Sequence, residues 1–106
     1  MIVKQRKTLI IIQKKNESSP SLHITHSNNL SAKERDYIIK VSIEAIKQSN
    51  NYLDITGYVS HALNNYDNSD NWHCICGLKE SFNITGPEKC GIAFTIGKYK
   101  FVIFKQ

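Results

Sequence analysis

The chain has 106 residues, which is enough for one domain with a modest hydrophobic core. Its hydrophobic fraction of 41% and charged fraction of 22% are ordinary for a globular domain and exclude wholesale disorder. The formal net charge is +5, but part of this excess lies in the first 20 residues, so it describes a basic arm more than a basic domain. Such an arm can contact nucleic acid or an acidic membrane surface, although a solvated tail explains it more simply.

Residues 1–20 form a basic N-terminal extension in two parts. Thr8–Gln13 is β-rich and could add an extra strand, whereas Lys14–Pro20 is polar and breaks regular structure, as in a disordered terminus. The longest apolar run, Leu9–Ile12, is too short for a signal-peptide core or a membrane span. We therefore expect a cytoplasmic protein with one domain at residues 21–106.

The domain opens with a predicted strand at Ser21–His26, where apolar and polar residues alternate. In a regular strand, Leu22, Ile24 and His26 share one face. His23 and His26 are three residues apart, so they are expected to face opposite ways and to be poor partners for one metal ion.

Two helices are predicted next. Ser31 and Glu34 have the spacing of a capping box, in which each side chain accepts a hydrogen bond from a free backbone N–H. The helix that they open ends near Ser49, Asp54 can cap a second helix, and turn-forming residues at 67–71 end it. The apolar stripes at helical spacing are Tyr37, Ile38, Val41, Ala45 and Ile46, and then Ile55, Val59, Ala62, Leu63 and Tyr66.

The last third of the chain has the alternation of strands. Candidate strands are Trp72–Gly77, Glu80–Thr85, Ile92–Ile96 and Tyr99–Phe104, and Gly97-Lys98 fits a two-residue type II′ hairpin turn. Helices followed by a run of strands indicate an α+β fold. We expect two helices on a mostly antiparallel sheet of four to five strands.

The cysteines and histidines give little support to catalysis. Three cysteines without a C-x-x-C pair fit a reducing compartment better than a disulfide framework or a zinc ribbon. His73 and Cys74 are adjacent in a strand and face opposite ways, so they cannot form a nucleophile–base pair. A metal site built on Cys74 and Cys76 would need Cys90 or His61 as further ligands, and buried packing is the simpler role. We expect no enzyme activity and no cofactor, with a thiol- or metal-dependent enzyme as the minor alternative.

Sheet edges are the remaining candidate for function. Glu80–Thr85 is the expected free edge, because it is polar and is followed by Gly86-Pro87. A second copy of the chain or an extended peptide can add a strand there. The alternation of basic and aromatic residues in Lys98–Phe101 is also found in single-strand nucleic-acid binders, but a half-exposed hairpin explains it more simply.

The motif Trp72-His73-Cys74-Ile75-x-Gly77, followed by Phe94-x-Ile96-Gly97 and Ile103-Phe104-Lys105, resembles the small dimeric dynein light chains of the hub type. The resemblance covers residues 21–105, because the predicted strand and helices lie at matching distances upstream. It implies a strand-swapped homodimer in which Glu80–Thr85 crosses to the sheet of the other subunit. Peptides from disordered segments then add along that edge, in two parallel grooves.

The function implied by the resemblance is that of a non-catalytic light chain or adaptor of a dynein motor. Its partners would be the dynein intermediate chain or other proteins with disordered linear motifs, in a cytoskeleton-associated, cytoplasmic or axonemal motor. His73, Phe82 and Ile84 would lie at the dimer interface. The implied groove residues are Tyr52, Leu53, Asp54, Glu80, Ser81, Phe82, Asn83, Ile84, Thr85, Gly91, Ala93 and Thr95.

Several implied groove positions depart from the family pattern. Large aromatic residues usually stand where Gly91, Ala93 and Thr95 stand here, and a charged pair usually stands at Tyr52 and Leu53. Glu80–Asn83 replaces the usual Phe-Gly-Ser-Tyr and Gly86 replaces a histidine, whereas Thr85 is retained. The alternative is therefore a structural paralogue with a remodelled groove and a non-standard partner.

Overall fold

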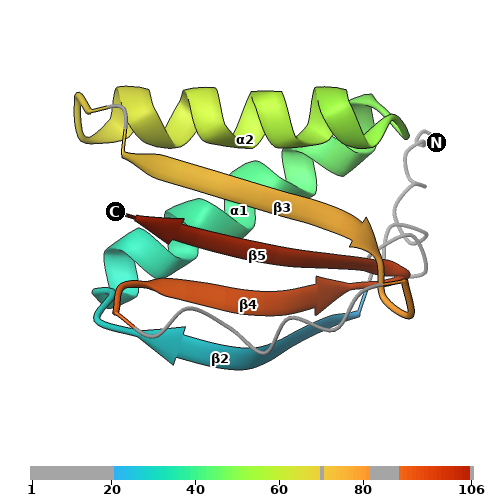
Figure 1. Cartoon of the computed structure of the whole chain (residues 1–106), viewed down its shortest axis with the longest axis horizontal. Helices are drawn as coiled ribbons and strands as arrows, with labels where there is room; N and C mark the ends of the chain where they lie inside the picture. Colours follow the sequence, from blue (N-terminus) through green and yellow to red (C-terminus); the bar gives the residue numbers. More distant parts are fainter. Residues whose placement is uncertain (1–20, 70, 82–88, 106) are drawn as a thin grey trace, which may run out of the picture.

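Two helices lie on one face of an antiparallel sheet in the computed structural model, which describes residues 21–69, 71–81 and 89–105 (Figure 1). The elements in chain order are β2 (Leu22–Asn28), α1 (Ala32–Gln48), α2 (Tyr52–Tyr66), β3 (Trp72–Leu78), β4 (Gly91–Ile96) and β5 (Tyr99–Lys105). The predicted α+β architecture is confirmed. The extension at residues 1–20 and the segment Phe82–Thr85 lie outside the described residues.

Within the described residues, the sheet has four strands in the order β2-β4-β5-β3, and every neighbouring pair is antiparallel. The β4–β5 hairpin therefore forms the centre, and β2 and β3 form the two edges. The connecting turn is the predicted one, since Gly97 has φ of 57° and Lys98 does not have a positive φ. This is the arrangement that a type II′ turn requires.

Helix α1 begins as its sequence predicts. The Glu34 N–H donates to Ser31 Oγ over 3.0 Å, and the Ser31 N–H donates to Glu34 Oε1 over 2.9 Å, which completes the capping box. Ser42 lies on the buried stripe and satisfies its hydroxyl by donating to the Ile38 carbonyl over 2.8 Å. The helix therefore enters the core without an unpaired polar side chain at that position.

Helix α2 begins three residues earlier than a cap at Asp54 would place it, so that prediction was wrong. The cap is Asn51, whose Oδ1 accepts hydrogen bonds from the N–H groups of Leu53 at 2.9 Å and Asp54 at 3.2 Å. The physical reason is that an asparagine oxygen can satisfy two of the free N–H groups of a first turn. Asp54 instead lies in that turn, where its charge favours the helix start.

The hydrophobic core lies between the helices and the sheet. The rings of Phe94 and Phe101 stack at its centre with centroids 5.2 Å apart. The predicted stripes supply the helical side of the core, although Tyr66 remains 40% exposed and stacks on Tyr37. The buried cluster comprises Ile38, Val41, Ala45, Ile55, Val59, Leu63, Trp72, Ile92, Phe94, Ile96, Phe101 and Ile103.

Strand β2 contains a bulge that the sequence interpretation did not include. The register shifts between Ile24 and His26, so that Thr25 is the extra residue. His23 pairs with Thr95 and His26 pairs with Ala93, which places both histidines on the same face. The expectations that they face opposite ways and that His26 shares a face with Leu22 and Ile24 were therefore wrong, because one inserted residue reverses the alternation that follows it.

The described helices are also too short or too polar to cross a lipid bilayer.

Candidate functional site

Strand β3 is the regular edge of the sheet. Its seven residues pair in unbroken register with β5, from Trp72 opposite Lys105 to Leu78 opposite Tyr99. Among the described strands it has no partner on its other side (Figure 1). The backbone groups on that side can therefore receive a further strand.

The two faces of β3 have different environments. Trp72, Cys74 and Cys76 face the helices and pack on the core, as predicted. His73 and Ile75 face the opposite side of the sheet, which no described helix covers and which we call the open face. His73 is exposed and stacks on Phe104 with centroids 5.3 Å apart, and Ile75 is 37% exposed.

The thiols of β3 are poorly suited to nucleophilic chemistry. Burial, together with the neighbouring Cys76, raises the pKa of Cys74 far above its usual range. Burial raises the pKa of Cys76 to about 12. Since a thiolate is the reactive form, both groups are inert near neutral pH. Among the described residues, no three histidine, cysteine or acidic side chains come together as metal ligands.

The start of β3 is held by Asp67 in the preceding turn. Asp67 Oδ2 accepts hydrogen bonds from the Trp72 indole N–H and from Lys105 Nζ, both at 2.8 Å, and its Oδ1 accepts one from the Ser69 hydroxyl at 2.7 Å. The bond from Lys105, followed by that from Ser69, lowers the pKa of Asp67 to about 2. The network joins the last strand of the chain to the edge strand.

An apolar corner lies at the other end of β3. The first turn of α2 presents Tyr52, which is 38% exposed, and Leu53, which is 80% exposed. The ring of Tyr52 contacts that of Tyr99 edge-on, with centroids 6.0 Å apart, and Leu78 is 42% exposed. We call these four residues the apolar corner. It adjoins the end of the open edge, so a strand added to β3 would have side-chain contacts available beside it.

The remaining predicted groove residues are only partly brought together. Asp54 is exposed beside the apolar corner, where the Ser49 hydroxyl contacts its carboxylate at 3.5 Å. Glu80 and Ser81 lie in a turn after β3 and not in a strand, so the prediction of a strand beginning at Glu80 was wrong for these two residues. The physical reason is that the Ser81 N–H and hydroxyl both donate to the Leu78 carbonyl, which closes a turn. The rest of that predicted strand, Phe82–Thr85, lies outside the described residues.

Gly91, Ala93 and Thr95 lie on the open face of the central strand β4. Their partners across the sheet on β5 are Phe104, Val102 and Lys100. Gly91 and Ala93 are buried and Thr95 is half-buried. The structure therefore places the three predicted positions in one row, on the same face of the sheet as His73.

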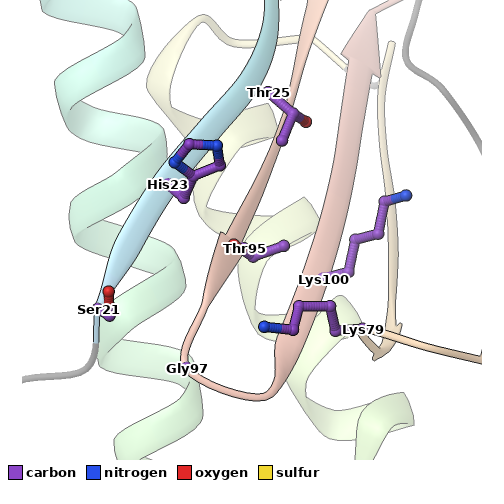
Figure 2. Close-up of a pocket in the computed structure, with 7 residues that line it drawn as sticks. All are labelled: Ser21, His23, Thr25, Lys79, Thr95, Gly97 and Lys100. Atoms are coloured by element: carbon purple, nitrogen blue, oxygen red, sulfur yellow. The ribbon is translucent and has the colours of Figure 1, made fainter.

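A polar pocket of about 510 Å³ opens at the Thr95 end of this row (Figure 2). Its described lining comes from the residue before β2, from three strands, from the segment after β3 and from the hairpin turn. None of these lining residues is acidic, and three of them carry a basic side chain. They are Ser21, His23, Thr25, Lys79, Thr95, Gly97 and Lys100.

This pocket was not predicted from the sequence, although part of the signal is present there. The predicted hairpin turn at Gly97-Lys98 already places Thr95 opposite Lys100, on one face of the sheet. The pairing of His23 with Thr95 joins segments more than seventy residues apart in the sequence, and no local pattern specifies it.

The sequence matches the family model of dynein light chain type 1 over residues 23–106. The match includes both helices and, apart from Leu22, all of the described strands. No curated protein matches the chain.

The fold is similar to that of the dynein light chain-like domain of the calcium-binding protein FhCaBP2 from Fasciola hepatica. The native form of that domain aligns with a TM-score of 0.64 and 9% sequence identity, over 85% of this chain and 95% of the domain. Its mercury derivative aligns with a TM-score of 0.60 and 10% identity, over 84% of this chain and 97% of the domain. At this identity the likeness shows a shared fold and nothing more.

Proposed function

Because the chain belongs to the dynein light chain family, we propose that it is a non-catalytic adaptor that binds extended segments of partner proteins by strand addition at a sheet edge. The observation that carries the proposal is the regular open edge of β3 beside the apolar corner. An edge strand of this kind supplies backbone hydrogen bonds to any extended chain, and the corner adds side-chain selectivity. The raised pKa values of the Cys74 and Cys76 thiols argue against the thiol-enzyme alternative.

We further propose that two copies associate through the open face of the sheet. His73, Ile75 and Phe104 place aromatic and aliphatic surface on this face. A homodimer in which Phe82 and Ile84 join His73 at the interface would cover that surface and present two grooves. Sedimentation equilibrium should then give about twice the protomer mass of 12.1 kDa, and a protomer mass at micromolar concentration would refute the dimer.

The partners proposed on the same basis are a dynein intermediate chain or other proteins with disordered linear motifs, in a cytoplasmic or axonemal motor. The test is calorimetric titration with a peptide that carries a motif typical of the family. Leu53→Glu should weaken the binding at least about five-fold, because a carboxylate replaces an apolar contact beside the edge. Asn65→Glu, at the far end of α2, adds the same charge away from the corner and should leave the binding unchanged.

A second candidate function is that of a structural paralogue with a remodelled groove and a partner of its own. The observation that favours it is the row Gly91, Ala93 and Thr95, which carries no aromatic side chain on the open face. Failure of the family-type peptide to bind at high micromolar concentration, in a protein that is still dimeric, would select this candidate over the first.

A further inference from the structure

An apolar groove lies on the helix side of the sheet, between α1 and the start of β2. Its volume is about 540 Å³. Leu22, Ile39 and Ile43 supply its apolar surface, and charged side chains of α1 surround them. The groove and the open face lie on opposite sides of the sheet, so the proposed dimer leaves the groove uncovered.

The edge strand β2 has side chains that point toward the core but are not covered by it. Leu22 pairs with Ile96 and Ile24 pairs with Phe94, and both of these partners are fully buried. Because paired residues share a face of a sheet, Leu22 and Ile24 point toward the helices. They are nevertheless 43% and 38% exposed. Exposed apolar surface with a polar rim is typical of an interaction site.

The charged rim of the groove favours an uncharged occupant. Asp36 and Glu44 contribute two carboxylates, and Lys40 and Lys47 contribute two ammonium groups, so the formal charges cancel. The Glu44 carboxylate also accepts a hydrogen bond from the Tyr58 hydroxyl over 3.3 Å. A rim without net charge concentrates ions of neither sign, whereas removing the apolar surface inside it from water is favourable. The preferred occupant is therefore a run of aliphatic side chains with no charge among them.

The chain carries such a run shortly before β2. Leu9–Ile12 consists of consecutive aliphatic residues, and the uncharged Thr8 and Gln13 flank it. The polar segment Lys14–Pro20 joins the run to Ser21, the first described residue. The N-terminal extension thus combines an apolar run with a tether that ends beside the groove.

The tether is long enough to bring the run into the groove. Fully extended, Lys14–Pro20 spans at most about 25 Å. The wall of the groove on α1, from Asp36 to Lys47, is about 17 Å long at about 1.5 Å per residue. Leu22 lines the groove and directly follows the first described residue. A short tether gives the run an effective concentration on the order of 1 mM, which favours it over a separate partner.

We propose that Leu9–Ile12 packs into the groove between α1 and β2 of its own chain and covers Leu22 there. The contact is made by side chains and needs no hydrogen-bonded ladder, so the bulge at Thr25 does not oppose it. The extension is then an intramolecular cover for the β2 side of the molecule, and the β3 edge stays open. The proposal goes beyond the adaptor function and does not depend on it.

The test measures how fast a cysteine introduced into the groove reacts in the full chain. Leu22→Cys is treated with a bulky maleimide near neutral pH, and the labelling of each cysteine is followed by mass spectrometry. Ile39 and Ile43 keep the groove apolar in this variant. Adding Ile10→Asp/Ile11→Asp puts two carboxylates into the run and should speed labelling at position 22 at least about five-fold, because the run leaves the groove.

The matched control is Gln5→Asp/Ser19→Asp, which adds the same charge to the extension outside the run. It should leave the rate at position 22 unchanged. Leu53→Cys, on the apolar corner, should be labelled equally fast with and without the two carboxylates in the run. The buried Cys74 and Cys76 should stay unlabelled in every variant, which reports that the domain remains folded.

Three results would each overturn the proposal. The first is an equal rate at position 22 with and without the two carboxylates in the run. The second is protection at position 53 in place of position 22, which would assign the run to the apolar corner. The third is protection at position 22 that is lost on dilution, which would assign the cover to a second copy. Peptide binding at β3 is measured separately, so the adaptor function stands or fails independently of these results.

Discussion

The Asp67 network makes a measurable contribution to stability whose dependence on pH can be worked out. The pKa of Asp67 is lowered from 3.8 to about 2, chiefly by the hydrogen bond from Lys105. A difference of about 1.8 pH units corresponds to about 2.5 kcal/mol between the two protonation states. The Lys105 and Asp67 side chains remain 32% and 21% exposed, so water screens the pair and we expect about 1–2 kcal/mol.

The sign follows from the direction of the shift. The folded protein has the lower pKa, so the stabilisation is fully present above the unfolded value of 3.8 and is lost as the pH falls toward 2. Asp67→Asn keeps the shape of the side chain and an oxygen that can accept from the Trp72 indole, but it removes the charge. The variant should therefore be about 1–2 kcal/mol less stable at pH 7, and the difference from wild type should shrink below pH 4.

The assay is urea unfolding followed by Trp72 fluorescence, at one protein concentration and in a series of buffers between pH 7 and pH 2. Asp36→Asn, at an exposed position on α1, is the matched control and should change the free energy of unfolding by no more than a few tenths of a kcal/mol. A wild-type stability for Asp67→Asn at pH 7 would refute the reasoning, as would a loss of stability that is the same at every pH.

Two further predictions concern local features. Asn51→Ala removes the side-chain acceptor of two N–H groups at the start of α2 and should lower the free energy of unfolding by about 1 kcal/mol in the same urea assay, whereas Asn50→Ala beside it should have little effect. Cys74 and Cys76 should be alkylated by iodoacetamide at pH 8 at least about a hundred-fold more slowly in the native protein than in the unfolded chain, because burial keeps both thiols protonated. Rapid labelling of Cys76, measured by mass spectrometry, would contradict this and would restore the case for thiol chemistry.

Features that depend on neighbouring residues were predictable from the sequence. The Ser31–Glu34 capping box and the Gly97-Lys98 turn each involve a few adjacent residues, and both occur as expected. The alternation in Trp72–Gly77 also predicted correctly that Trp72, Cys74 and Cys76 share the core face. Periodicity and local hydrogen bonding decide such features, whatever the rest of the fold.

Features that depend on distant segments were not predictable in the same way. The bulge at Thr25 is accompanied by a hydrogen bond to the Ala93 carbonyl, 68 residues away, and no local pattern marks it. The polar pocket likewise needs the pairing of β2 with β4 and the position of Lys79 beside the hairpin. The missed cap has a different cause, since asparagine and aspartate both cap helices and the sequence offered Asp54 only three residues after Asn51, which is the residue that caps the second helix.

The bulge at Thr25 also makes the two edges of the sheet unequal. A bulge interrupts the regular spacing of N–H and C=O groups and increases the local twist, so another chain cannot easily align along the β2 edge. The β3 edge keeps its spacing over seven residues. A sheet that can add a strand at only one of its two edges forms a closed complex once a single strand has been added there. The difference between the two edges therefore disfavours the repeated edge-to-edge association of sheets that builds fibres, while the β3 edge stays available for binding.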